Sequence, residues 1–203
     1  MRKDLLDLEK RSGNYPLSHY FRASDFPSDL LKKYQNRCWA DRLDGAAPSD
    51  DDTNYTLLGL LLMEQKGWNF TSEDVLECWL SHLPLAAVCT AERVAYRNGA
   101  NGLLPPETAT TCNPYREWIG AQIRADFFGY ACPGQPEKAA ALAFRDAAIS
   151  HVKNGIYGEM WIAAMLAEAA ITDDLFQVLK AGLGQIPSSC RLQEDIQRVI
   201  CWK

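Results

Sequence analysis

Residues 50–63 read DDDTNYTLLGLLLM: three adjacent carboxylates and a hydroxyl lead into an almost unbroken apolar run. The run is long enough for a buried helix, so Asp50, Asp51 and Asp52 are expected at its N-terminus. Two unit charges ~4 Å apart repel by about 4 kcal/mol at a surface-like dielectric. A helix N-terminus returns only ~0.3–1 kcal/mol for each acid. Helix capping therefore explains one or two of these acids, and the three together invite a bound cation.

A cation bound to this stretch would have oxygen ligands only, which suits Mg²⁺, Ca²⁺ or Mn²⁺ rather than zinc. The alternative is an acidic, solvated loop in which Asp52 or Thr53 caps the helix. Spacing alone leaves both interpretations open and somewhat favours the loop, because short motifs often match by chance.

Length and composition exclude several classes of protein. The chain has 203 residues and a hydrophobic content of 47%, which fits a single domain over residues 1–203 with a sizeable core. With a net charge of −5 and no basic clusters, the sequence does not predict the positively charged surface that binds nucleic acid. No apolar run reaches the roughly 20 residues that span a bilayer, and the N-terminus lacks a signal peptide. We therefore expect a cytoplasmic protein with no nucleic-acid or membrane partner.

The cysteines point the same way. There are seven, an odd number, with no CxxC pair, and the three histidines are dispersed along the chain. A zinc site or a disulfide framework is therefore not expected, and reduced thiols fit a cytoplasmic protein. Three cysteines have apolar neighbours in the sequence and are expected to be buried: Cys78, Cys89 and Cys201.

Helical spacing of apolar residues dominates the chain, and alternating strand patterns are scarce, so we predict an all-α fold. A short charged helix opens the chain. Further helices are predicted over 53–66, from a cap at 71–74 to Pro84, over 91–97, 118–128, 137–151 and 157–170, after a cap at 172–174, and from 188 onward. Repeated alanines make the helix at 137–151 slim enough for a close neighbour. Residues 99–115 are predicted to form a long loop.

Two further segments could take part in a site. In the segment from Asn113 to Arg124, Gly120 and Ala121 lack bulk, so their backbone amides could approach a ligand. Arg124 could pair with a phosphate or with a carboxylate such as Asp126. The alternative is that the Gly-Ala pair serves packing.

The second of these segments is Ser150-His151, followed by Gly155-Ile156-Tyr157-Gly158. Glycines that flank a tyrosine indicate a turn with close backbone approach. His151 could donate a hydrogen bond to a phosphate or a ribose. The alternative, which is more common for a lone histidine, is a structural residue with its hydrogen bonds satisfied.

Taken together, these segments resemble the ADP-ribosylglycohydrolase family. The family's first metal motif, Thr-Asp-Asp-Thr at the start of a buried helix, is similar to Asp50-Asp51-Asp52-Thr53, with Asp in place of the first Thr. Its Gly-Ala-x-x-Arg segment resembles Gly120-Ala121-Gln122-Ile123-Arg124. Its Ser/Thr-His segment with a following Gly and Tyr resembles Ser150-His151 through Tyr157-Gly158. The three motifs occur in family order and the resemblance covers most of residues 14–203.

The resemblance implies a roughly orthogonal bundle of packed helices that binds two divalent ions, usually Mg²⁺ with Mn²⁺ as a substitute. It implies hydrolysis of ADP-ribose from a modified protein side chain or from a small ADP-ribosyl compound. Asp50, Asp51 and Asp52 would be metal ligands, and Asp51 and Asp52 would be closest to the catalytic step. The residues implied to bind the substrate are Gly120, Ala121, Arg124, Ser150, His151, Tyr157 and Gly158.

Two family features are not found in the sequence. A second acidic motif, Asp-x-Asp-Thr, would follow the matched region, and a Gly-rich segment that ends near a catalytic-site Glu would precede residue 1. The chain is therefore expected to be an interior section of the fold with one half of the metal site, so that it either hydrolyses ADP-ribosyl compounds or is inactive as it stands. Two other interpretations stay open: a non-catalytic relative that binds ADP-ribose or a nucleotide, and a helical scaffold with no small ligand.

Overall fold

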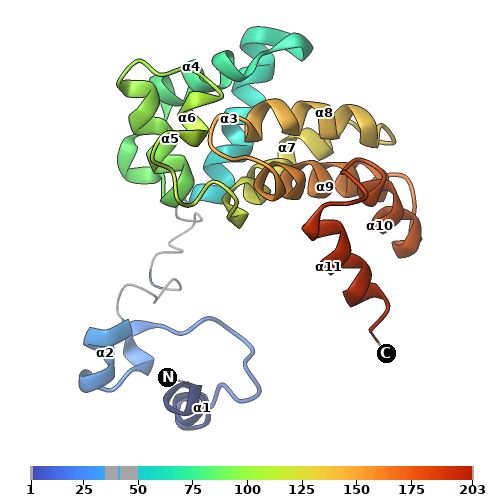
Figure 1. Ribbon diagram of the computed structural model, residues 1–203. Coiled ribbons are helices and arrows are strands. Elements are labelled where there is room, and N and C mark those ends of the chain that lie inside the picture. The colour runs from blue at the N-terminus through green and yellow to red at the C-terminus, as the bar shows by residue number, and fades with distance from the viewer. Residues whose placement is uncertain (1, 35–40, 42–49, 203) are drawn as a thin grey trace. The chain divides into compact units, whose positions relative to one another are not determined.

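The computed structural model describes residues 2–34, 41 and 50–202. These residues contain eleven α-helices and no strand, so the all-α prediction is confirmed (Figure 1). The chain divides into two compact units, Met1–Ser49 and Asp50–Lys203, and each is described by itself. Within the described ranges, every helix is too short or too polar to cross a membrane.

The first unit contains α1 (Arg2–Arg11), which is the predicted charged helix, and α2 (Ser28–Tyr34). Asn14 organises the turn after α1. Its side-chain oxygen accepts from the Ser18 backbone N–H at 2.8 Å, and its amide donates to the His19 carbonyl at 2.8 Å. A buried amide whose oxygen and nitrogen both have hydrogen-bond partners holds this turn in place.

The second unit is built around one central helix. Its elements are α3 (Asp51–Lys66), α4 (Ser72–His82), α5 (Thr90–Ala100), α6 (Glu107–Thr110), the 3-10 helix η6 (Ile119–Arg124), α7 (Ala125–Tyr130), α8 (Pro136–Ala147), α9 (Asn154–Ala169), α10 (Leu175–Leu183) and α11 (Arg191–Ile200). Helices α7, α8 and α10 and the 3-10 helix η6 all pack on α9, and Figure 1 shows α7, α8 and α9 side by side.

Several boundaries differ from the sequence prediction. The helix predicted over 118–128 is two short pieces, η6 and α7, and the helix predicted over 137–151 ends at Ala147. Ser150 and His151 therefore lie in the connection between α8 and α9. The loop predicted over 99–115 contains the short helix α6.

Helix α3 begins two residues earlier than predicted, at Asp51, because Asp50 is its N-cap. The Asp50 carboxylate accepts from the Thr53 backbone N–H at 3.4 Å, so neither Asp52 nor Thr53 caps the helix. Gly67 ends the helix as predicted, with a φ of 69° that favours glycine. The predicted cap at Thr71 is also confirmed, with a reciprocal bond to Asp74.

The predicted slim helix does lie against its neighbour closely. Helix α8 packs along α9, and fully buried alanines come from both helices: Ala139, Ala143 and Ala147 from α8, and Ala163, Ala164 and Ala167 from α9. Small side chains let two helix backbones approach, so the alanine run sets the position of α9 and of the residues that precede it.

The six cysteines in the described ranges are free thiols, and Cys38 lies outside those ranges. Cys78 is buried as predicted. Cys89 and Cys201 are exposed, so the prediction that they pack as small hydrophobes is wrong. Cys89 is the residue just before α5, where its side chain makes no cap hydrogen bond, and Cys201 is the residue just after α11.

Candidate functional site

The acid cluster lies at the N-terminus of α3. Asp50, Asp51 and Asp52 are all exposed, and each offers an oxygen atom such that the three atoms lie within 4.8 Å of one another. Partial burial, and then the charges of Asp51 and Asp50, raise the pKa of Asp52. This mutual repulsion is the condition that a bound cation relieves.

The donor set fits a hard divalent cation. All three groups offer carboxylate oxygens, which Mg²⁺ prefers, and no sulfur or imidazole competes. Two oxygens on one Mg²⁺ are at most about 4.2 Å apart, so exposed carboxylates separated by up to 4.8 Å need only a small shift of their side chains. The residues present are therefore compatible with the metal that the resemblance implies.

Tyr55 connects this cluster with the interior. It lies one turn after Asp51 on α3, where positions i and i+4 share a face. Its buried ring is 5.7 Å from the guanidinium carbon of Arg124, and the Trp79 ring lies on the same guanidinium at 4.9 Å. Burial raises the pKa of Tyr55, so its hydroxyl stays protonated. The acid cluster thus stands about one helical turn from a buried charged centre.

Arg124 is the middle of that centre and is only 1% exposed. A guanidinium has five N–H donors, and the structure gives five acceptors. Nε donates to the Asp146 carboxylate. One terminal nitrogen donates to Glu92 at 3.2 Å and to the Ser150 hydroxyl at 2.9 Å; the other donates to the Asp146 carbonyl at 3.1 Å and to Glu159 at 3.4 Å. In this arrangement no N–H of Arg124 is left for a ligand, and Asp126 is not among its partners.

The three carboxylates around Arg124 exceed its single positive charge. Burial lowers the pKa of Arg124, but Asp146, Glu159 and Glu92 outweigh that effect and raise it. Burial, and then the charge of Asp146, raise the pKa of Glu159 well above its usual range. Burial also raises the pKa of Glu92, against the opposing effect of Arg124. The cluster therefore favours a proton on Glu159.

Ser150 and His151 are both fully buried beside this cluster. The Ser150 hydroxyl is 2.8 Å from His151 Nδ1, and His151 Nε2 is 3.9 Å from the nearer Glu92 oxygen. Burial, and then the charge of Arg124, lower the pKa of His151 to about 3, so the imidazole is neutral. Nε2 is one of the few buried polar atoms without a hydrogen-bond partner in the described part of the chain.

The predicted glycines make close contacts, but the turn predicted around Tyr157 is wrong, because Gly155 and Gly158 lie at the start of helix α9. A Cβ on Gly120 would lie 2.4 Å from a Glu92 oxygen, and a Cβ on Gly158 would lie 2.6 Å from the side-chain nitrogen of Gln122. Ala121 is fully buried in a small cluster, and the half-buried Tyr157 packs against that cluster. The structure thus brings the 120–124 and 150–158 segments together around Arg124. Their role in binding a ligand stays a prediction.

Sequence reasoning missed the acids that hold Arg124 and the amide that holds the connection. Asn113 is buried and donates to the carbonyls of Ser150, at 3.0 Å, and of Ala91, at 3.3 Å. Asn113 stands in a segment that the sequence singled out, but Glu92, Asp146 and Glu159 carry no motif. Their signal is only a charged residue at an otherwise apolar helix face.

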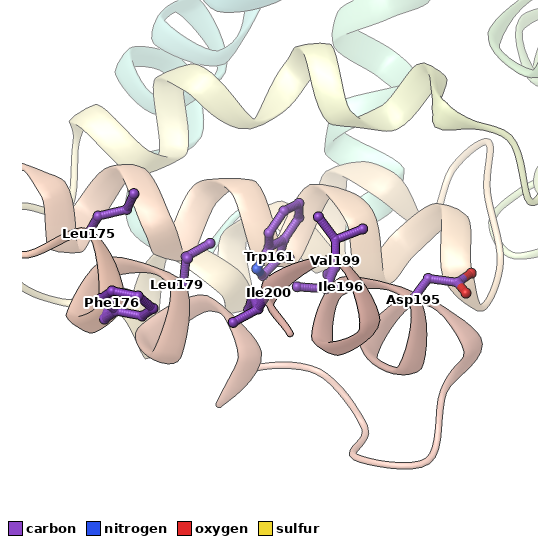
Figure 2. Close-up of a pocket in the computed structure, with 8 residues that line it drawn as sticks. All are labelled: Trp161, Leu175, Phe176, Leu179, Asp195, Ile196, Val199 and Ile200. Carbon is purple, nitrogen blue, oxygen red and sulfur yellow. The ribbon is translucent and has the colours of Figure 1, made fainter. Parts of the chain in front are cut away.

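A separate apolar groove lies between α9, α10 and α11 (Figure 2). Its volume is about 530 Å³, and Asp195 is the only charged side chain among its lining residues. The others are Trp161, Leu175, Phe176, Leu179, Ile196, Val199 and Ile200. A diphosphate needs N–H donors or a cation, so this groove is a poor candidate for the chemistry that the acid cluster offers.

Comparison with known proteins gives one family. The sequence model described as ADP-ribosylglycohydrolase matches residues 12–202, which include all three segments discussed above. Searches of curated proteins and of solved structures found no match. Because the matched region spans nearly the whole chain and the structure is all-α, the resemblance seen in the sequence is confirmed. This chain belongs to the ADP-ribosylglycohydrolase family.

Proposed function

We propose that this protein is a Mg²⁺-dependent hydrolase that removes ADP-ribose from a modified side chain or from a small ADP-ribosyl compound. One observation carries the proposal: three carboxylates converge at the start of α3, inside the region that the family model matches. Membership of the family supports glycohydrolase activity in general, and the oxygen-only cluster supports the metal.

The residues of this chain would divide the work. Asp50, Asp51 and Asp52 would hold the metal, and Asp51 and Asp52 would orient the attacking water through hydrogen bonds. When bound, Mg²⁺ supplies positive charge that polarises water and ribose hydroxyls. Cleavage of a glycosidic bond passes through an oxocarbenium-like state, so the attacking water must be held at the anomeric carbon.

The buried centre would keep the cleft in shape. Glu92 lies directly behind Gly120, and Arg124 links that carboxylate to Ser150. The backbone of η6 and the 150–158 segment would therefore be held as one surface for the ADP-ribose moiety. In this proposal Arg124 supports the cleft from behind, since its donors are all used within the protein.

The test is release of ADP-ribose from an ADP-ribosylated protein, with Mg²⁺ or with EDTA. Asp51→Asn keeps the shape of the side chain and removes its charge, and Asp173→Asn is the matched control, an exposed acid just before α10. We expect the parent and Asp173→Asn to release ADP-ribose with Mg²⁺ and not with EDTA. In Asp51→Asn we expect the rate of release to fall by at least about tenfold. A rate of release that neither EDTA nor Asp51→Asn changes contradicts the proposal. Binding of ADP-ribose without release would identify a non-catalytic relative, and no binding at all would identify a scaffold.

A further inference from the structure

His151 has one ring nitrogen with a partner and one without. Nδ1 is 2.8 Å from the Ser150 hydroxyl, while Nε2 is buried and has no partner in the described part of the chain. Which nitrogen carries the proton decides whether the free atom is a donor or an acceptor. The neighbours of Ser150 settle that question.

The Ser150 hydroxyl is already an acceptor. Arg124, which has no lone pair to offer, donates an N–H to it at 2.9 Å. The hydroxyl hydrogen then needs an acceptor of its own, and among the described residues the atom in reach is His151 Nδ1. If Nδ1 instead carried the proton, the buried Ser150 hydroxyl hydrogen would be left without an acceptor, at the cost of an unmade hydrogen bond.

The surroundings of Nε2 independently favour a proton on that nitrogen. Nε2 lies 3.9 Å from a Glu92 oxygen, too far for a hydrogen bond but close enough for electrostatic attraction. A bare Nε2 would present a lone pair to that carboxylate, whereas an Nε2–H presents a positive dipole. The doubly protonated ring is disfavoured by burial and by Arg124.

From this geometry we infer that Arg124 and Ser150 are positioning residues that hold His151 as the neutral Nε2–H tautomer, so that Nε2–H is the donor reserved for an acceptor oxygen of the bound ADP-ribosyl group. The ligand part of this inference rests on the proposed function; the tautomer part does not. A buried N–H without a partner is costly, and a ligand oxygen that accepts from it recovers that cost on binding.

The tautomer can be read without any activity. The chain has three histidines, His19, His82 and His151, so two-bond ¹⁵N–¹H correlation spectra of histidine-labelled protein contain three ring systems. The spectrum of His151→Asn identifies the signals of His151 by their absence. At pH 7 we expect His151 to be protonated at Nε2 and bare at Nδ1. A ring protonated at Nδ1, or at both nitrogens, overturns the inference.

Ser150→Ala and Ser150→Thr test whether the Ser150 hydroxyl sets the tautomer of His151. Ser150→Ala removes the hydroxyl and should give a mixture of tautomers, with an affinity for ADP-ribose about threefold to tenfold weaker by calorimetry. Ser150→Thr keeps the hydroxyl and should restore the Nε2–H form. Circular dichroism and the melting temperature show whether both variants fold, and the wild-type spectrum stands even if they do not. An unchanged tautomer and unchanged affinity in folded Ser150→Ala overturn the positioning role.

The ligand role has its own readout. Addition of ADP-ribose with Mg²⁺ to the wild-type protein should shift the Nε2–H resonance of His151, with little effect on His19 or His82. Binding that leaves the His151 signals unchanged, or no binding at millimolar ADP-ribose, overturns the ligand role. Binding with the expected shift but without hydrolysis supports the inference and removes only the proposed reaction.

Discussion

The role of Arg124 in the structure differs from the role that the sequence suggests. In the sequence it closes a Gly-Ala-x-x-Arg segment and is a candidate to bind a phosphate. In the structure its carboxylate partners stand 22 to 35 positions away along the chain, and they use its donors inside the protein. No local pattern encodes such partners, so sequence reasoning could place Arg124 near the site but could not state its role.

The excess of acid around Arg124 gives a prediction for Glu159. Its pKa is raised, so the stability that its protonated form contributes is present at low pH and is lost as the pH rises through the raised value. Glu159→Gln resembles the protonated form. We expect its free energy of unfolding to be within about 1 kcal/mol of wild type near pH 5, and to exceed that of wild type increasingly as the pH rises. Urea unfolding from pH 5 to 9 measures this difference.

Asp146→Asn is the contrasting variant in the same cluster. It removes the negative charge of the carboxylate that accepts the hydrogen bond from Arg124 Nε–H. The buried guanidinium then has less negative charge around it to balance its positive charge. The expected cost is about 3–5 kcal/mol at pH 7. If Asp146→Asn and Glu159→Gln have equal effects across the pH range, the assignment of the proton to Glu159 is wrong.

Gly120 gives a second prediction at this scale. In Gly120→Ala the new Cβ would meet the Glu92 carboxylate at 2.4 Å, and Glu92 is itself fixed by Arg124. We expect a loss of about 1–3 kcal/mol in the free energy of unfolding. Gly184→Ala is the control, since its nearest neighbours are 3.4 Å away and its backbone is helical, and it should be neutral or slightly stabilising. Equal stabilities of the two variants would contradict the close contact.

At the scale of elements, local signals in the sequence were reliable and long-range ones were not. The cap at Thr71 and the stop at Gly67 depend on neighbouring residues, and both were predicted. The helix predicted over 118–128 breaks into η6 and α7 because α9 packs against both pieces, and Ala121 and Gly129 are buried there. Packing by a helix some 40 residues further along overrides local helical spacing.

Helix α3 carries the prediction for this scale. Its N-terminus holds three acids whose repulsion a cation relieves, so a cation that binds the folded form raises the melting temperature. We expect Mg²⁺ to raise the melting temperature of the parent and of Asp173→Asn by a few degrees, and Asp51→Asn to lose most of that shift. Calorimetry with Na⁺ at equal ionic strength separates specific binding from screening. An equal shift in all three proteins would indicate screening alone.

At the scale of the molecule, the second unit combines a buried cluster of charged side chains with an exposed apolar groove on α9, α10 and α11 (Figure 2). Such exposed apolar surface binds hydrophobic dyes. We expect the native protein to enhance the fluorescence of 1-anilinonaphthalene-8-sulfonate, and Phe176→Ser to reduce it by about half or more. Phe176 is 71% exposed, and Leu57→Ser, at a 63% exposed position on α3, is the matched control. Equal loss in both variants would show that the dye does not report on the groove.

The saturation of Arg124 has a consequence for chemical labelling. Phenylglyoxal attacks guanidinium groups that are free of hydrogen bonds and open to solvent, and Arg124 meets neither condition. An arginine on the surface, such as Arg97, would react first. Arg124 would be modified only as quickly as the residues around it open. The delay of its adduct relative to the adducts of exposed arginines, followed by mass spectrometry, therefore measures the rate of local opening of the protein interior.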